Sequence, residues 1–322
     1  MQNQTLSQRK RKEKRKRKRQ TFMVRDRHEV WHSNPLTQAA VRTSSCNIVR
    51  QECGPSRFAK RFCDSIETCF TIFMRQNLLE VIGKWTNVEG PVVYKGKWKE
   101  TDLSELKKFI ELIILIGVYK SKHANVTQLW SQEDGHPIFN KIMSRRRFQQ
   151  ILQVLRFDDA SAKRKKRNDD KLEPTREVFE MWNQNLQDGY VPSSCMTVEE
   201  QLVSFRGRCP FRVYIPSKPG KYGIKIWVVY DSETSYVWKM QIYTGKDPVK
   251  GRETNQGSRV FGDLVRELEN TGHNITCDNF FTCLVLARKL LSKKPTLVGT
   301  IRKNRVELPS ALTNGKKDSM IL

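Results

Sequence analysis

The spacing of hydrophobic residues changes near Gly189, and this change constrains the fold more than any other feature of the sequence. Before Gly189, apolar residues recur at steps of three and four, as in amphipathic helices. After it, segments rich in β-branched and aromatic residues predict five strands, with helical patterns between the later ones. The predicted strands are 194–205, 222–231, 235–245, 273–279 and 296–303, and the predicted helices are 259–270 and 280–294. This order predicts an α/β fold with a mixed sheet and helices on its faces.

The chain before the sheet divides into two parts. Residues 1–55 mix basic and small polar residues without a clear period, which predicts a disordered basic tail. Residues 56–190 predict an all-α region. Thr101 or Asp102 is a candidate cap for one helix and Ser144 for another. The predicted organisation is therefore a tail over 1–55, a helical region over 56–190 and the sheet over 191–322.

Charge is the strongest compositional signal. The chain has 59 Lys and Arg against 34 Asp and Glu, a net charge of +25. Such an excess predicts a polyanionic partner and argues against a small neutral substrate. One dense basic run contributes part of it and predicts nuclear import, with a DNA contact or a solvated arm as alternatives. The run consists of Arg9, Lys10, Arg11, Lys12, Lys14, Arg15, Lys16, Arg17, Lys18 and Arg19.

Cysteine spacing and hydropathy exclude several classes of protein. The eight cysteines form no C-x-x-C pair and have no histidine at ligand spacing, so we predict no zinc site and mostly buried, reduced thiols. The N-terminus is charged, which argues against a secretory signal. The longest apolar run, 109–119, is too short to cross a membrane and contains Glu111. We therefore expect a soluble intracellular protein with no membrane partner.

Acidic residues near two predicted strands suggest a metal site. Glu199 or Glu200 on the first strand and Asp278 at the end of the fourth are candidates to share Mg²⁺, which prefers oxygen ligands and also coordinates phosphates. The alternative is structural. Asp278 could simply cap the helix predicted to follow it.

Longer motifs carry a resemblance to a known family. The stretches "MTVEEQLVSFRGRCPFRVYIPSKPGKYGIKIWVVYDSET" and "HNITCDNFFTCLVLARKLL" resemble piggyBac transposases, as does the upstream "SRRRFQQILQVLRFDD". The resemblance is collinear from about residue 56 to about residue 312. It implies a ribonuclease-H-like core that cuts and joins DNA with three aspartates and divalent metal. It also implies that the helical region serves dimerisation and DNA binding.

The resemblance assigns the acidic residues one by one. Glu199 falls where the family has its first aspartate, and Asp278 matches the second. The third acid would lie beyond Leu322, so we expect a C-terminally truncated, partial ribonuclease-H-like core. The extra methylene of Glu199 displaces its carboxylate by about 1 Å, enough to cost on the order of a hundredfold in rate. We expect Glu199 and Asp278 to form a degenerate site that binds Mg²⁺ weakly at best.

Basic residues on two segments are candidates for contact with the DNA backbone, although solvated positive charge is the alternative. They are Arg145, Arg146 and Arg147 at a helix start, and Arg206, Arg208, Arg212, Lys218 and Lys221 around a turn. The tryptophans Trp130, Trp182 and Trp227 could stack on bases, but their apolar surroundings favour the core.

These features predict a nuclear, transposase-derived protein that binds double-stranded DNA without catalysis and forms a possible homodimer. One alternative is a fragment of an active, metal-dependent transposase. Another is a non-catalytic module that binds RNA or acidic proteins through charge alone.

Overall fold

The computed structural model describes residues 21–24, 30–32, 48–121, 123–159, 170–245 and 253–313. The chain divides into two compact units. One unit contains Met1–Arg50, Ser194–Val198 and Asn255–Leu322, and the other contains Gln51–Ser193 and Glu199–Thr254. Helices and a mixed sheet are both present, which confirms the predicted α/β class.

Helices fill the first part of the larger unit. They are α2 (Arg57–Phe62), α3 (Ile66–Phe73), α4 (Gln76–Tyr94), α5 (Leu103–Val118), α6 (Val126–Leu129), α7 (Pro137–Ile142), α8 (Arg145–Val154) and α9 (Glu173–Gly189). The two predicted caps are confirmed. Asp102 Oδ1 accepts a hydrogen bond from the Glu105 amide at 2.7 Å, and Ser144 Oγ accepts one from the Arg147 amide at 3.3 Å. Each cap satisfies an amide that a helix start leaves without a partner.

Aromatic and aliphatic residues from α4, α5, α7 and α8 form the core of the helical part. Phe109, Phe139 and Ile151 are fully buried in it. Trp130 joins this cluster and donates from Nε1 to the Met143 carbonyl at 2.8 Å, which confirms its predicted core position. Burying such side chains is the main source of stability for helices of this length.

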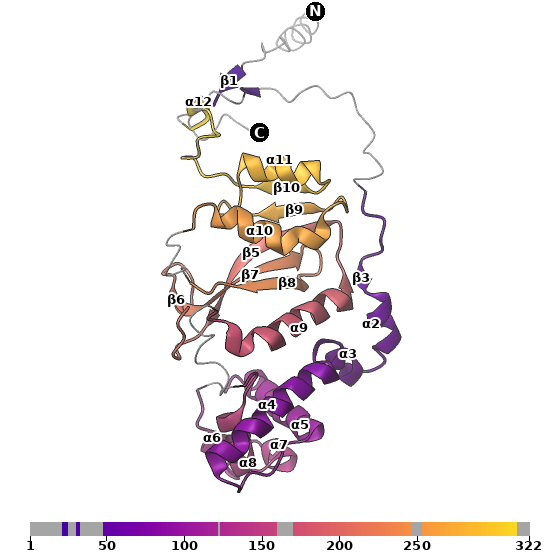
Figure 1. The fold of residues 1–322 in the computed structure, drawn as a ribbon, viewed down its shortest axis with the longest axis vertical. Helices are drawn as coiled ribbons and strands as arrows, with labels where there is room; N and C mark the ends of the chain where they lie inside the picture. Colours follow the sequence, from indigo (N-terminus) through magenta and orange to yellow (C-terminus); the bar gives the residue numbers. More distant parts are fainter. Residues whose placement is uncertain are drawn as a thin grey trace, which may run out of the picture. The chain divides into compact units, whose positions relative to one another are not determined.

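The sheet follows the predicted order closely. Its strands are β5 (Cys195–Ser204), β6 (Val213–Tyr214), β7 (Tyr222–Asp231), β8 (Val237–Ile242), β9 (Asn274–Cys277) and β10 (Thr296–Gly299). The strand order is β10-β9-β5-β7-β6, with β8 paired to β7. The first and fourth predicted strands are neighbours, as expected, because β5 pairs with β9 in parallel. Figure 1 shows α9 along β8.

The remaining helices belong to the smaller unit. They are α10 (Gln256–Val265), η3 (Arg266–Leu268), α11 (Leu284–Ser292) and α12 (Ser310–Thr313). The apolar face of α10 is fully buried at Val260, Phe261 and Leu264, and Ile275 of β9 is equally buried. The predicted helices 259–270 and 280–294 therefore exist, although each is shorter than its pattern suggested.

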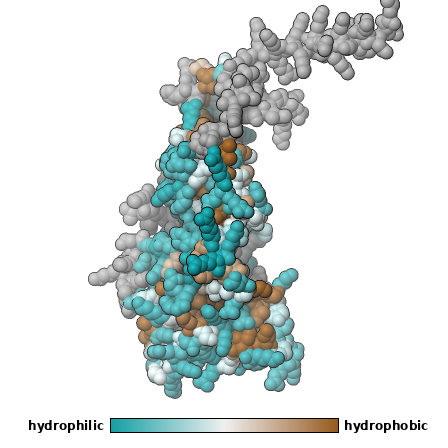
Figure 2. All heavy atoms as spheres, turned by 90° about the vertical axis from the view of Figure 1, so that its right-hand side faces the viewer, coloured by the Kyte–Doolittle hydropathy of each residue, from teal (hydrophilic) through white to brown (hydrophobic). Residues whose placement is uncertain are grey.

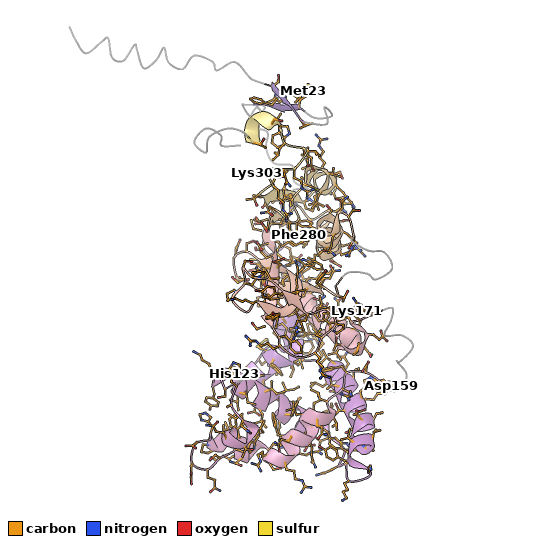
Figure 3. The ribbon with its side chains drawn as sticks, turned by 90° about the vertical axis from the view of Figure 1, so that its left-hand side faces the viewer. Met23, His123, Asp159, Lys171, Phe280 and Lys303 are labelled. Carbon is orange, nitrogen blue, oxygen red and sulfur yellow. A yellow bond between two sulfur atoms is a disulfide. The ribbon has the colours of Figure 1, made fainter. Side chains whose placement is uncertain are left out.

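Part of the N-terminal segment differs from the prediction. Where we expected no strands, β1 (Thr21–Met23) pairs with β2 (Val30–His32) in antiparallel register, and Figure 3 labels Met23 on the first of them. The Trp31 indole donates to the Glu307 carbonyl at 3.0 Å. A further strand pair joins β3 (Gly54–Pro55) to β4 (Tyr190–Val191). The basic run from Arg9 to Arg19 lies outside the described residues.

The cysteines also differ from the prediction. Cys63 and Cys69 form a disulfide between α2 and α3, where we expected reduced thiols. Among the other described cysteines, Cys277 and Cys283 are buried but Cys53 is exposed. Sequence spacing could not reveal the disulfide because the turn between the two helices, not a recognisable motif, brings the two residues together.

The surface is mostly hydrophilic on the face in Figure 2, with hydrophobic patches in its lower part. Large apolar side chains are exposed on α2 and α3, including Phe62 at 49% and Ile66 at 92%. Within the described ranges, no helix is both long enough and apolar enough to span a membrane.

Candidate nucleic-acid interface

The structure separates the roles of two adjacent glutamates on β5. The Glu200 carboxylate forms an ion pair with Lys225 Nζ, and Lys218 Nζ lies 3.9 Å from it. Side chains alternate between the faces of a strand, so Glu199 projects from the face opposite to Glu200. Glu199 is exposed. Of the two candidates that the sequence left open, Glu199 is therefore the one with a carboxylate available for a ligand.

The register of the parallel strands relates Glu199 to Asp278. Val198 on β5 and Cys277 on β9 are register partners. Glu199 directly follows the first and Asp278 directly follows the second. Each acid thus directly follows a residue of this registered pair, and the metal site that the two would share stays a prediction.

Asp278 does not cap the helix that follows it, so the structural alternative for this residue is wrong. The N-cap of α11 is Cys283, whose Sγ accepts from the Leu286 amide at 3.4 Å. Asp278 lies earlier, in a turn where its carbonyl accepts from the amides of Phe281 and Thr282. Its side chain is exposed and accepts from the Asn279 amide.

Close packing holds the turn after β9 in place. A Cβ atom at Gly257 would lie 2.4 Å from the Phe280 carbonyl oxygen, and one at Gly299 would lie 2.7 Å from the Cys277 carbonyl oxygen. Phe280, labelled in Figure 3, belongs to this turn. Because backbone atoms cannot move aside as a flexible side chain can, a larger residue at either glycine would displace the turn that carries Asp278.

Two carboxylates are a sparse ligand set for Mg²⁺, which requires near-octahedral oxygen coordination. In the part of the chain that the structure describes, no group of three or more His, Cys, Asp or Glu side chains could hold a metal ion. The predicted weak magnesium binding stays a prediction.

The charge of Glu199 affects the pKa of a neighbouring residue, Tyr230. Burial first, and then the negative charge of Glu199, raise the pKa of Tyr230 above its usual value. The Tyr230 hydroxyl donates to Gln201 Oε1 at 3.2 Å. Tyr230 therefore remains a neutral hydrogen-bond donor at physiological pH.

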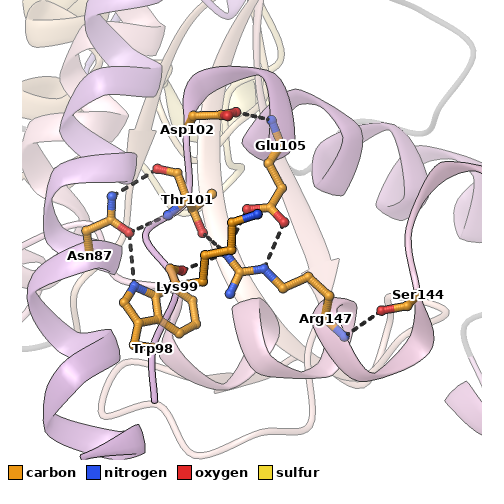
Figure 4. Close-up of polar contacts among 8 residues, drawn as sticks. All are labelled: Asn87, Trp98, Lys99, Thr101, Asp102, Glu105, Ser144 and Arg147. Atoms are coloured by element: carbon orange, nitrogen blue, oxygen red, sulfur yellow. Dashed lines mark hydrogen bonds and ion pairs between the residues drawn. The ribbon is translucent and has the colours of Figure 1, made fainter. Parts of the chain in front are cut away.

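The three arginines at the start of α8 have different surroundings. Arg147 makes a bidentate ion pair with Glu105, at 2.8 and 2.7 Å, and also donates to Thr101 Oγ1 and to the Lys99 carbonyl (Figure 4). Its guanidinium carbon lies 4.4 Å from the centre of the Trp98 ring. Arg147 is therefore held in the fold by these contacts, and its predicted contact with DNA stays a prediction.

Arg145 and Arg146 are exposed on the same helical turn. Neither occurs among the intramolecular ion pairs of the described residues. Their position opposes the helix dipole, and a bound anion would relieve that repulsion. They remain candidates for phosphate contact.

The 205–222 loop, which runs from the end of β5 to the first residue of β7, concentrates exposed positive charge. Arg206, Arg208, Arg212 and Lys221 are all exposed on it. Arg212 also shapes the loop, because its Nη1 donates to the carbonyls of Arg206 and Gly207 at 2.8 and 3.0 Å. Lys218 differs from the others. It is half-buried, and its ammonium donates to the Glu200 carbonyl at 3.2 Å.

Sequence reasoning missed the aromatic residues of this loop. Phe205, Tyr214 and Tyr222 are 38%, 55% and 44% exposed, respectively. Trp227, by contrast, is buried as predicted, whereas Trp182 is 36% exposed and only partly matches its predicted core position. One signal in the sequence could have revealed these exposed rings. In this loop, single aromatic residues alternate with arginines and lysines, whereas aromatic residues of the core lie within apolar runs.

Comparison with known proteins places this arrangement in a family. A family model described as Transposase IS4 matches residues 67–321. The chain belongs to the piggyBac-type transposase family. The matched residues include Glu199, Asp278 and the whole 205–222 loop, and they exclude β1 and β2.

Among piggyBac-type relatives, the human piggyBac transposable element-derived protein 3 is 27% identical over 256 residues, which cover 77% of this chain and 42% of that protein. The human chimeric ERCC6-PGBD3 protein is also 27% identical over 256 residues, covering 77% of this chain and 23% of its own length. The chain thus spans less than half the length of these two curated relatives.

A solved structure of the piggyBac type confirms the fold. The cryo-EM structure of a piggyBac transposase synaptic complex with hairpin DNA matches with a TM-score of 0.76 and 33% sequence identity. The match covers 83% of this chain and 57% of that one. The arrangement of helices followed by a mixed sheet is therefore that of a piggyBac transposase.

Proposed function

We propose that this chain is a DNA-binding protein derived from a piggyBac-type transposase, with little or no catalytic activity. The observation that carries the proposal is the set of four exposed cations on the 205–222 loop, which follows the strand that bears Glu199. Membership of a transposase family and the hairpin DNA in the similar solved complex support DNA as the polyanion. The net charge of +25 supports binding through phosphates, which is insensitive to base sequence.

The proposed loss of catalysis rests on Glu199. Magnesium, when bound by Glu199 and Asp278, would polarise phosphate oxygens. The longer side chain of Glu199 misplaces its carboxylate, and magnesium tolerates poor geometry badly. Glu200 offers no substitute, because its carboxylate is paired with Lys225 and projects from the opposite face of β5.

The proposal also includes a location in the cell and an oligomeric state. The basic run from Arg9 to Arg19 directs the protein to the nucleus, where its DNA partner is found. The helical region, residues 56–190, supports a homodimer, as the family resemblance implies. Exposed apolar side chains on α2 and α3, such as Phe62 and Ile66, are consistent with such an interface.

Salt dependence tests the phosphate contacts. We expect the affinity for a blunt DNA duplex, measured by fluorescence anisotropy between 50 and 200 mM salt, to fall steeply as salt rises. The slope of log K against log salt is negative, and the double substitution Arg206→Ala and Arg208→Ala should reduce its magnitude by about 2. Each lost phosphate contact removes about one unit.

A matched control uses Arg259→Ala together with Arg266→Ala. Both of these arginines pair with Asp263, so the substitution removes the same formal charge from a site that one carboxylate already partly neutralises. We expect its slope to stay within about half a unit of the parent value. An equal loss in both double variants would mean that net charge alone determines binding. Equal affinity for RNA and DNA would favour the alternative of a non-catalytic module that binds RNA or acidic proteins through charge alone.

A strand-transfer assay tests the loss of catalysis. With Mg²⁺ or Mn²⁺ and transposon-end DNA, we expect no nicked or joined product from this chain, and the Glu199→Asp variant provides the side-by-side comparison. Metal-dependent product that disappears in an Asp278→Ala variant would show that the centre works, and would favour the alternative of a fragment of an active transposase.

A further inference from the structure

We propose that the 205–222 loop binds single-stranded DNA by stacking unpaired bases on Tyr214 and Tyr222, while its cations hold the adjoining phosphates. This inference rests on the proposed DNA-binding function and adds a substrate class to it. The loop connects β5 to β7 and contains the short strand β6, seen beside β7 in Figure 1.

The register of β6 and β7 places the two tyrosines together. Tyr214 and Tyr222 are partners in this antiparallel pair, so their side chains project from the same face. Their ring centroids are 4.8 Å apart, with an angle of 40° between the planes. The guanidinium of Arg212 lies 5.6 Å from the centre of the Tyr222 ring. The result is a small aromatic platform bordered by a cation.

A purely structural role explains this platform poorly. Cross-strand aromatic pairs do stabilise hairpins, by about 0.2–1 kcal/mol. Such pairs gain most when they are covered, whereas Tyr214 is 55% exposed and Tyr222 is 44% exposed. Phe205, at 38% exposed, adds a third accessible ring on the same loop. Three accessible aromatic rings on one short basic loop suit a flat, aromatic ligand.

The charge around the rings suits a nucleic-acid backbone. Arg206, Arg208, Arg212 and Lys221 are exposed, and no carboxylate of the described residues forms an ion pair with them. Arg212 is held by the carbonyls of Arg206 and Gly207, so its position beside Tyr222 is fixed before any ligand arrives. Basic grooves with interspersed aromatic rings are the usual means of binding single strands.

Exposed rings distinguish single strands from duplexes. In a duplex the faces of the bases are hidden in the stack, and only their edges and the phosphates are accessible. A tyrosine ring on the protein surface can therefore stack only on a base that has left the stack, as in single strands, loops and ends. Each such contact typically changes affinity about five- to 150-fold, as alanine substitutions show.

Substitutions at the two tyrosines test the inference. We would compare the parent chain with a Tyr214→Leu, Tyr222→Leu variant, using a labelled oligothymidine and a labelled blunt duplex at one salt concentration. Leucine preserves apolar bulk but removes the aromatic face. We expect the oligothymidine affinity to fall about tenfold or more, while duplex affinity changes less than about twofold. A Tyr214→Phe, Tyr222→Phe control should bind both ligands as the parent does.

The outcomes separate this inference from the function on which it rests. If the parent chain binds no duplex, the proposed function fails. If the duplex binds but the leucine variant holds oligothymidine as tightly as the parent, the stacking site is wrong. A parallel loss of both ligands would also overturn it, since it would show that the rings act through the fold.

A second readout does not depend on substitution. An oligonucleotide containing 2-aminopurine loses fluorescence when that base stacks on an aromatic ring. We expect quenching on addition of the parent chain and recovery with the leucine variant. Unchanged fluorescence with the parent chain would contradict stacking, and tighter binding of oligouridine than of oligothymidine would contradict DNA as the ligand.

Discussion

Replacing Arg147 with alanine is expected to lower the free energy of unfolding by about 2–4 kcal/mol. The substitution leaves the Glu105 carboxylate without its bidentate partner in a setting where the two side chains are only 24% and 13% exposed, respectively. It also removes the donor to Thr101 Oγ1 and the cation above Trp98. Breaking a partly buried pair costs more than an exposed pair contributes, because a desolvated charge remains.

Urea denaturation followed by tryptophan fluorescence measures this effect, because Trp98 and Trp130 lie in the helical part. Arg146→Ala is the matched control. It removes the same charge from the neighbouring, exposed position and should change stability by less than about 0.5 kcal/mol. Arg147→Lys should give an intermediate loss, since lysine keeps the charge but not the two-pronged geometry. Equal stability of the Arg146 and Arg147 alanine variants would contradict the structural role.

Asp231→Asn is expected to cost about 2–4 kcal/mol at pH 7. Asp231 is fully buried at the end of β7. Its Oδ2 accepts from the Ser193 amide at 2.6 Å, and its Oδ1 accepts from the amides of Glu233 and Thr234, both at 3.0 Å. Asparagine would place an NH₂ group against one set of these donors. The exposed neighbour Glu233 offers a control, and Glu233→Gln should be nearly neutral.

The same carboxylate predicts a pH dependence. Burial disfavours its charged form, but the hydrogen bonds from Ser193, Thr234 and Glu233 outweigh burial and lower the pKa of Asp231 below its usual value. The contribution of Asp231 to the free energy of unfolding is therefore complete above its pKa in the unfolded chain, about 3.9. It is lost as pH falls through the lower pKa of the folded protein. The stability difference between the parent and Asp231→Asn should shrink below about pH 4. A constant difference down to pH 3 would contradict this assignment.

Local patterns predicted the longer elements well. β7 has the bounds that its hydrophobic run suggested, and the caps at Asp102 and Ser144 depend on residues only three positions away. Short elements were missed because they are too short to contain a local pattern. β6 has two residues and forms because β7 pairs with it. No hydrophobic period within so short a segment could predict a strand.

The candidate site was predictable only in part, because its details depend on distant residues. Alternation places Glu199 and Glu200 on opposite faces but does not say which face has a partner. Lys225, which settles the question, comes 25 residues later. Likewise, Arg147 was assigned to the interface by its position at a helix start, while its partner Glu105 lies 42 residues earlier.

The two glutamates of β5 also restrict how this strand can evolve. The deletion of a residue just before Glu199 would turn every later side chain of the strand to the other face and would put Gln201 in the place of Glu200. Glu200 would then leave Lys225, and a half-buried ammonium would lose its counter-ion. Point substitution at Glu199 carries no such penalty. Position 199 can therefore accept substitutions, aspartate among them, without a shift of the strand.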